Sequence, residues 1–171
     1  MRKNNLYIIY PILTFFCFLS LGGCNFESDY DIADKNINQL LEALDNQDRN
    51  KIKSIFALSI QTNISSFDDD IDQLFSYYEG EYESYTSNGV GTTFDRNDGI
   101  EKKYFDMSYD VTTTINIYRL GIIWYVKDSS QSENIGIWSL YILKYQDDTD
   151  QSSAYRSEGE NGIHVAKPRL P

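Results

Sequence analysis

The first apolar positions after residue 30 recur at the spacing of an α-helix. They lie three or four residues apart, and acidic residues such as Asp31 stand in the first turn, where the helix dipole favours negative charge. The positions on this face are Ile32, Ala33, Ile37, Leu40, Leu41 and Leu44. The pattern predicts an amphipathic helix that starts at Asp31.

Two further helices are predicted before residue 80. A polar break at residues 46–48 ends the first helix, and Asp48 is placed to cap a second one. The buried face of this second helix is expected to contain Ile52, Ile55 and Phe56, with Leu58 as a further candidate. Spacing of i, i+3, i+4 and i+7 predicts a third helix. Its apolar positions are Ile71, Leu74, Phe75 and Tyr78.

After Gly80 the repeat changes from about 3.6 residues to about 2, the period of β-strands. Residues 81–86 alternate and end at Asn88-Gly89, and the glycine-rich residues 89–99 are expected to form a loop. Residues 103–112 predict a strand with one buried face. That face carries Phe105, Met107, Tyr109 and Val111. Residues 118–126 and 137–145 are apolar on both faces in their middles, which is typical of central strands.

The order of these elements predicts an α+β fold, in which N-terminal helices pack on a curved antiparallel sheet of about four to five strands. Short polar connections at residues 113–116 and 128–134 favour an antiparallel meander. One domain is expected over residues 31–171, and its polar tail from Asp147 either adds an edge strand or stays loose. The only histidine, His164, lies in this tail and is expected to be exposed.

Two acidic runs invite comparison with cation sites. Asp68 to Asp70 open the third helix, and the helix dipole alone explains three carboxylates there. Residues 95–99 resemble a calcium loop but lack its alternating acidic spacing and its terminal glutamate. We therefore expect no metal at either run.

Residues 1–23 have the layout of a secretory signal peptide. Arg2 and Lys3 form a basic start, and residues 6–21 are mainly apolar. A helix of 16 residues at about 1.5 Å per residue spans roughly 24 Å, which is short of a hydrocarbon core of about 30 Å. An exported chain is therefore expected rather than a membrane-spanning one.

The end of this leader resembles the bacterial lipobox, which the lipoprotein signal peptidase recognises. Leu21, Gly22 and Gly23 precede Cys24 in the required order. The resemblance implies cleavage before Cys24, acylation of its thiol, and a short tether at residues 24–30. Two acyl chains anchor a protein stably, so we expect a protein bound to the outer side of a cell membrane through its lipid.

Composition narrows the function classes. The full chain carries a net charge of −11, and loss of the two leader cations would make it −13. Such acidity disfavours nucleic acid as a partner. Cys17 lies in the leader and Cys24 is the expected acylation site, so the domain keeps no thiol for a disulfide, a metal or a nucleophile. No cofactor site is recognised.

Three segments together resemble DUF5104, a family of small bacterial lipoproteins of unknown function. They are the helical corner at residues 40–56, residues 71–80 with the later Gly89-Val90-Gly91, and the strands at residues 118–125 and 136–141 with Gly162-Ile163. The resemblance implies a cone-shaped fold like that of nuclear transport factor 2. It supplies no catalytic residues.

Three function classes remain open. The first is a non-catalytic binding module with an aromatic pocket between sheet and helices. Packing in the hydrophobic core is an alternative explanation for the same aromatic residues. The candidate pocket residues are Phe75, Tyr78, Tyr109, Trp124, Trp138 and Tyr141. The second is an isomerase or dehydratase, disfavoured because Asp106 and Asp110 alternate away from the core. The third is an immunity or envelope-assembly factor that docks a basic partner protein.

Overall fold

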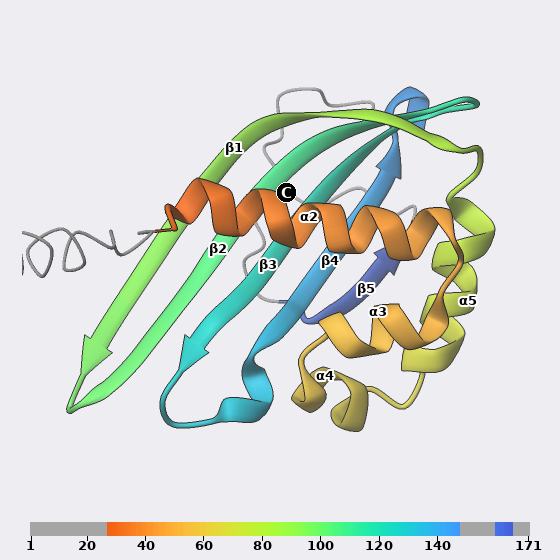
Figure 1. The fold of residues 1–171 in the computed structure, drawn as a ribbon. Coiled ribbons are helices and arrows are strands. Elements are labelled where there is room, and N and C mark those ends of the chain that lie inside the picture. Colours follow the sequence, from red (N-terminus) through yellow and green to blue (C-terminus); the bar gives the residue numbers. More distant parts are fainter. Residues whose placement is uncertain (1–26, 148–159, 166–171) are drawn as a thin grey trace, which may run out of the picture.

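The computed structural model describes residues 27–147 and 160–165, and within them the helices precede the strands (Figure 1). The helices are α2 (Asp29–Asp45), α3 (Arg49–Ile55), α4 (Leu58–Asn63) and α5 (Phe67–Tyr77). The strands are β1 (Tyr82–Asn97), β2 (Ile100–Thr113), β3 (Ile117–Asp128), β4 (Gly136–Lys144) and β5 (Gly162–Val165), with short 3₁₀ turns η1 (Ser132–Asn134) and η2 (Tyr145–Asp147). The predicted α+β class is confirmed. In the described part of the chain, no helix has both the length and the apolar character that crossing a membrane requires.

The strands form one sheet in the order β1-β2-β3-β4-β5. The first four are antiparallel neighbours, which confirms the predicted meander. The tail does add an edge strand, but β5 runs parallel to β4, with Ser139 opposite Gly162 and Ile142 opposite Val165. The sheet is therefore mixed rather than wholly antiparallel.

Side chains cap the first turns of both α2 and α3, and of these two caps only that of Asp48 was predicted. Ser28 Oγ accepts a hydrogen bond from Asp31 N at 3.2 Å, and Asp31 Oδ2 accepts one from Ser28 N at 3.0 Å. This capping box places the start of α2 at Asp29, two residues before the predicted start. Asp48 caps α3 by accepting a hydrogen bond from Lys51 N at 3.0 Å.

The prediction that Leu58 is buried was wrong, because a helix that the sequence pattern did not reveal begins there. Ala57 N donates a hydrogen bond to Ile137 O in β4 at 3.0 Å, and the chain turns at this contact. In the α4 that follows, Ile60 enters the core while Leu58 is 57% exposed.

The predicted loop at residues 89–99 was also wrong. These residues continue β1 as far as Asn97, each pairing with a residue of β2. The hairpin turns at Asp98 and Gly99, which have φ angles of 49° and 82°. Two successive positive φ values are those of a tight hairpin turn. Asn88-Gly89, which was expected to end the strand, instead lies at a β-bulge within it.

The core lies between α2 and one face of the sheet. Helix α2 crosses the strands on this face (Figure 1), and Ile37 and Leu40 on its inner side are fully buried. The alternation predicted for β2 is confirmed, since every second side chain from Phe105 to Val111 is 0% exposed. Helix α5 packs beside β5 at the opposite side of the sheet from β1.

Candidate functional sites

Three of the six aromatic residues expected to line a pocket belong to the core. Tyr78, Tyr109 and Trp124 are 5%, 0% and 7% exposed. Burial raises the pKa of the Tyr78 and Tyr109 hydroxyls, so both stay neutral. Phe75 is half-buried and packs against the same core. These side chains fill the space between helices and sheet.

Tyr141 lies on the other face of the sheet, because its neighbours Leu140 and Ile142 point into the core. It stacks on His164, with ring centroids 4.3 Å apart. Trp138 is half-buried beside Tyr125, at a centroid distance of 6.4 Å. The six predicted residues are thus divided between the core and the outer face, and no single cavity can be lined by all of them.

The expectation that His164 is exposed was wrong. Parallel pairing of β5 with β4 places His164 opposite Tyr141, and its residue exposure is 8%. The sequence carried no signal for this position, because β5 is only four residues long and follows a long polar stretch.

A polar hollow lies at the corner between α2 and α3. It encloses about 460 Å³ and is lined by Glu42, Ala43, Asn46, Asp48 and Lys51. None of the predicted aromatic residues contributes to it. Two of its members, Asn46 and Asp48, already cap the adjoining helices.

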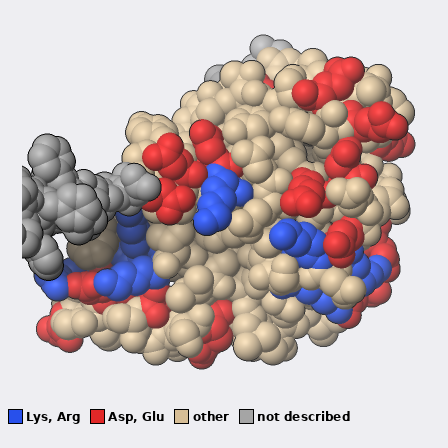
Figure 2. Space-filling model, viewed as in Figure 1, with Lys and Arg blue, Asp and Glu red and all other residues tan. Residues whose placement is uncertain are grey.

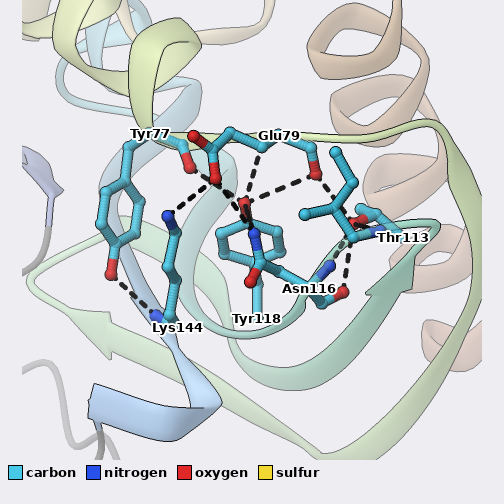
Figure 3. Close-up of polar contacts among 7 residues, drawn as sticks. Tyr77, Glu79, Thr113, Asn116, Tyr118 and Lys144 are labelled. Atoms are coloured by element: carbon cyan, nitrogen blue, oxygen red, sulfur yellow. Dashed lines mark hydrogen bonds and ion pairs between the residues drawn. The ribbon is translucent and has the colours of Figure 1, made fainter.

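A cluster of six polar residues joins the α5–β1 connection to the β2–β3 turn and to the end of β4 (Figure 3). We call this cluster the Glu79 clamp. Its members are Tyr77, Glu79, Thr113, Asn116, Tyr118 and Lys144. They come from segments up to 67 residues apart in the sequence.

The buried Tyr118 hydroxyl stands at the centre of the Glu79 clamp. It accepts a hydrogen bond from Glu79 N at 2.7 Å and donates one to Tyr77 O at 2.9 Å. Thr113 Oγ1 lies 2.8 Å from Glu79 O and 3.0 Å from Asn116 N. Both backbone groups of Glu79 are therefore held by side chains of β2 and β3.

The carboxylate of Glu79 forms the charged side of the clamp. Lys144 Nζ lies 2.9 Å from Glu79 Oε2, and Asn116 Nδ2 lies 3.1 Å from the same oxygen. The hydrogen bond from Lys144 holds the pKa of Glu79 below its usual range, and the same contact raises the pKa of Lys144. Both groups are charged at neutral pH, so neither is poised to exchange a proton there.

Strand β1 forms a free edge of the sheet. It is 16 residues long, and along most of its length the residues are exposed. Residues 84–94 contain no charged residue and no proline. Within the described ranges no strand pairs with its outer side. Such an edge presents unpaired backbone donors and acceptors to a partner strand.

The acidic runs have other roles in the structure. Asp68 lies 2.6 Å from Lys53 Nζ and 3.4 Å from Arg49 Nη1. Residues 95–99 are the end of β1 and its turn. Across the residues that the structure describes, no three His, Cys, Asp or Glu side chains gather where they could hold a metal ion.

Comparison with models of protein families identifies a relationship for this chain. No curated protein matches the chain. A family model described as "Domain of unknown function (DUF5104)" matches residues 39–164, about three quarters of the chain. The matched region runs from the middle of α2 into β5 and thus includes the Glu79 clamp and the whole of β1. The chain belongs to the DUF5104 family, a family of unknown function.

Proposed function

We propose that this protein is an exported lipoprotein, held at the outer side of a cell membrane through Cys24, and that its domain binds an extended segment of another protein along the free edge of β1. The observation that carries the proposal is the length and character of that edge. An exposed strand of 16 residues is long for an edge, and edges are usually shortened or protected by Lys or Pro. Residues 84–94 contain neither, and beyond the bulge between Ser87 and Gly89 the strand keeps one continuous register with β2 from Gly89 to Asn97.

The residues of this edge suit the addition of a strand. Backbone hydrogen bonds give such complexes affinity, and alternate side chains give them specificity. Thr86, Thr92 and Thr93 are β-branched, and Val90 and Tyr85 add apolar contact area. All but Tyr85 and Val90 between residues 84 and 94 are exposed.

Charge at the two ends of β1 indicates the chemistry of the partner. Glu81 and Glu83 precede the uncharged run, and Asp95 and Asp98 follow it. At the second end Arg96 pairs with Glu101, and Lys102 of β2 stands opposite Asp95, so the acidic excess lies at the Glu81 end. A partner strand with an uncharged middle and Lys or Arg at the end that meets Glu81 and Glu83 complements this edge, and salt would weaken its binding.

The proposed anchor is supported by sequence. Leu21-Gly22-Gly23-Cys24 follows a basic and then apolar leader, and the first described helix is capped by Ser28, only four residues after Cys24. The proposal assigns no reaction. Asp110 on the outer face is paired with Arg119 at 3.0 Å, and the clamp carboxylate is paired with Lys144.

Site-specific cross-linking in the native membrane tests the docking. The full-length protein carries a photoreactive benzoyl-phenylalanine at Thr86 or at Thr93, with Ser132 on the β3–β4 connection as the exposed control position. We expect both edge positions to cross-link to the same protein at low salt and Ser132 to give none of it. Equal cross-linking from all three positions would refute docking along β1.

Matched edge variants separate docking from general stickiness. Thr86→Lys with Thr93→Lys introduces the charges that block edge pairing, whereas Thr86→Val with Thr93→Val keeps β-branched side chains. The lysine pair should reduce cross-linking from a nearby third position, Ser84, at least tenfold, and the valine pair should retain it. Loss with both pairs, or with neither, contradicts the proposal. Recovery of the lipoprotein alone would also contradict it and favour a small ligand.

The anchor has its own test. Cys24→Ser should move the protein from the membrane fraction to the soluble fraction and abolish incorporation of a labelled fatty acid. A variant that stays membrane-bound without label would show that Cys24 is not the attachment site.

A further inference from the structure

The beginning of α2 lies over the β1–β2 hairpin. Asp29, the first residue of α2, has its carboxylate 2.5 Å from Lys103 Nζ in β2. Lys103 pairs across the ladder with Phe94 of β1. The ion pair between Asp29 and Lys103 fixes the first turn of α2 a few residues from the turn of the hairpin. We call residues 94–100, which include that turn, the hairpin tip.

The distance between the proposed anchor and this end of the domain is short. The helix cap Ser28 lies four residues after Cys24. Fully extended, each residue spans at most about 3.6 Å, so the connection reaches about 14 Å. If Cys24 is acylated, as the proposed function holds, the start of α2 cannot move farther than this from the lipid headgroups.

Large apolar side chains are exposed at the same end. Tyr30 in the first turn of α2 is 68% exposed, and Phe94 and Ile100 at the hairpin tip are 56% and 43% exposed. Aromatic side chains that lie near polar groups favour the boundary between water and lipid. These three residues thus offer contact area to a headgroup layer.

Basic side chains offset most of the acidity at this end, although the chain as a whole is acidic: Asp95 stands opposite Lys102, and Asp98 adds one charge at the turn. Asp29 pairs with Lys103, and Glu101 pairs with Arg96 and Lys127. Figure 2 shows the corresponding mixture of blue and red at the left of the view, whereas red predominates at the upper right. An anionic membrane surface repels unpaired acidic groups, so this end, where Asp29 and Glu101 are paired, approaches it at a lower electrostatic cost than the upper right of the view.

We propose that the hairpin tip and Tyr30 rest on the headgroup layer of the bilayer that holds the Cys24 lipid, and that this second contact fixes the orientation of the domain. Strand β2 has 14 residues, and at about 3.3 Å per residue it carries the chain about 45 Å from the tip to the β2–β3 turn. The Glu79 clamp at that turn then faces away from the membrane, and the free edge of β1 runs from the bilayer outward.

The sequence allows the domain to be labelled at a single cysteine. The chain has two cysteines, Cys17 in the leader and Cys24 at the anchor, so a new cysteine in the domain is the single free thiol of the mature lipoprotein. A fluorophore is attached to Asn97→Cys at the hairpin tip or, as the matched control, to the exposed Ile115→Cys at the far turn. Each full, acylated protein is placed in vesicles of phosphatidylcholine and phosphatidylglycerol with nitroxide-labelled headgroups.

We expect at least threefold stronger quenching at position 97 than at position 115. Phe94→Ser with Ile100→Ser should bring quenching at position 97 close to the value at position 115, while the protein stays on the vesicles through its lipid. Equal quenching at both positions in the parent protein, or quenching unchanged by the serine pair, overturns the proposal. The mass of the purified protein reports the acyl group separately: equal quenching of an acylated protein refutes the orientation alone, whereas an absent acyl group refutes the anchor as well.

Discussion

Removing one oxygen from the centre of the Glu79 clamp should measurably destabilise the fold. Tyr118→Phe keeps the ring and its packing, because the residue is 0% exposed and the two side chains differ only by the hydroxyl. The change removes the acceptor for Glu79 N at 2.7 Å and the donor to Tyr77 O at 2.9 Å. Glu79 N and Tyr77 O, both at a partly buried site, then lose their hydrogen bonds to this hydroxyl.

The expected cost follows from those two groups. A typical hydrogen bond contributes about 1 kcal/mol to the free energy of unfolding, and a buried donor left unsatisfied costs about 1–3 kcal/mol. We therefore expect a loss of about 2 kcal/mol. With a urea dependence of about 1.5–2 kcal/mol per molar, the midpoint of urea unfolding should fall by about 1 M. Unfolding followed by tryptophan fluorescence and by circular dichroism measures the shift.

Two comparisons make this test decisive. Tyr85→Phe also removes a hydroxyl, but that hydroxyl lies 3.4 Å from Asp34 at an exposed site, so it should cost about 0.5 kcal/mol or less. Thr113→Val releases the other backbone group of Glu79, so the double variant with Tyr118→Phe should lose less than the sum of the two single losses. A Tyr118→Phe midpoint equal to that of Tyr85→Phe would refute the clamp as a source of stability.

Three further outcomes are expected in the same unfolding assay. Gly136→Ala should cost several kcal/mol, since φ is +123° and a Cβ would lie 2.7 Å from Ala57 N; Gly91→Ala, whose Cβ would meet nothing closer than 3.6 Å, should be nearly neutral. Burial opposes ionisation of Asp128, but hydrogen bonds from Ser130, Gln131 and Asn134 outweigh it and lower its pKa to about 2. Asp128 therefore contributes its full stabilisation above the unfolded pKa of about 4, and this contribution is lost as pH falls toward 2. Over that interval the free energy of unfolding should drop more steeply in the parent protein than in Asp128→Asn, and parallel slopes would contradict this. Ser28→Ala should cost about 1 kcal/mol through loss of the α2 cap, and an unchanged midpoint would show that the cap is not needed.

Periodicity was sufficient to predict most elements, because each of them buries one continuous face. The strand β1 shows where it fails. The sequence offers two turn signals, Asn88-Gly89 and Asp98-Gly99, and residues between them are polar enough to read as a loop. The second pair forms the turn, and backbone pairing with β2 extends β1 as far as Asn97. An edge strand exposed along its length has no buried face from which to predict it.

The Glu79 clamp and the position of His164 could not be predicted for a different reason. Glu79 and Lys144 are 65 residues apart, and Tyr141 meets His164 only through a short parallel strand. Each residue alone looks like an ordinary polar position. The sequence pattern likewise does not show whether Leu58 or Ile60 is buried, because the contact between Ala57 and Ile137 determines it.

The late position of β5 in the sequence has a consequence for how the domain folds. The pairs β1–β2, β2–β3 and β3–β4 join sequence neighbours, so each can form as soon as both strands have emerged during synthesis. Helix α5 differs, because it packs against β5, which lies more than 80 residues later. Gly162 at the start of β5 approaches the side chain of Ile64 so closely that a Cβ would lie 2.6 Å from it. The side of the core next to α5 therefore stays open until nearly the whole chain has emerged, and closure of the domain depends on the four residues of β5.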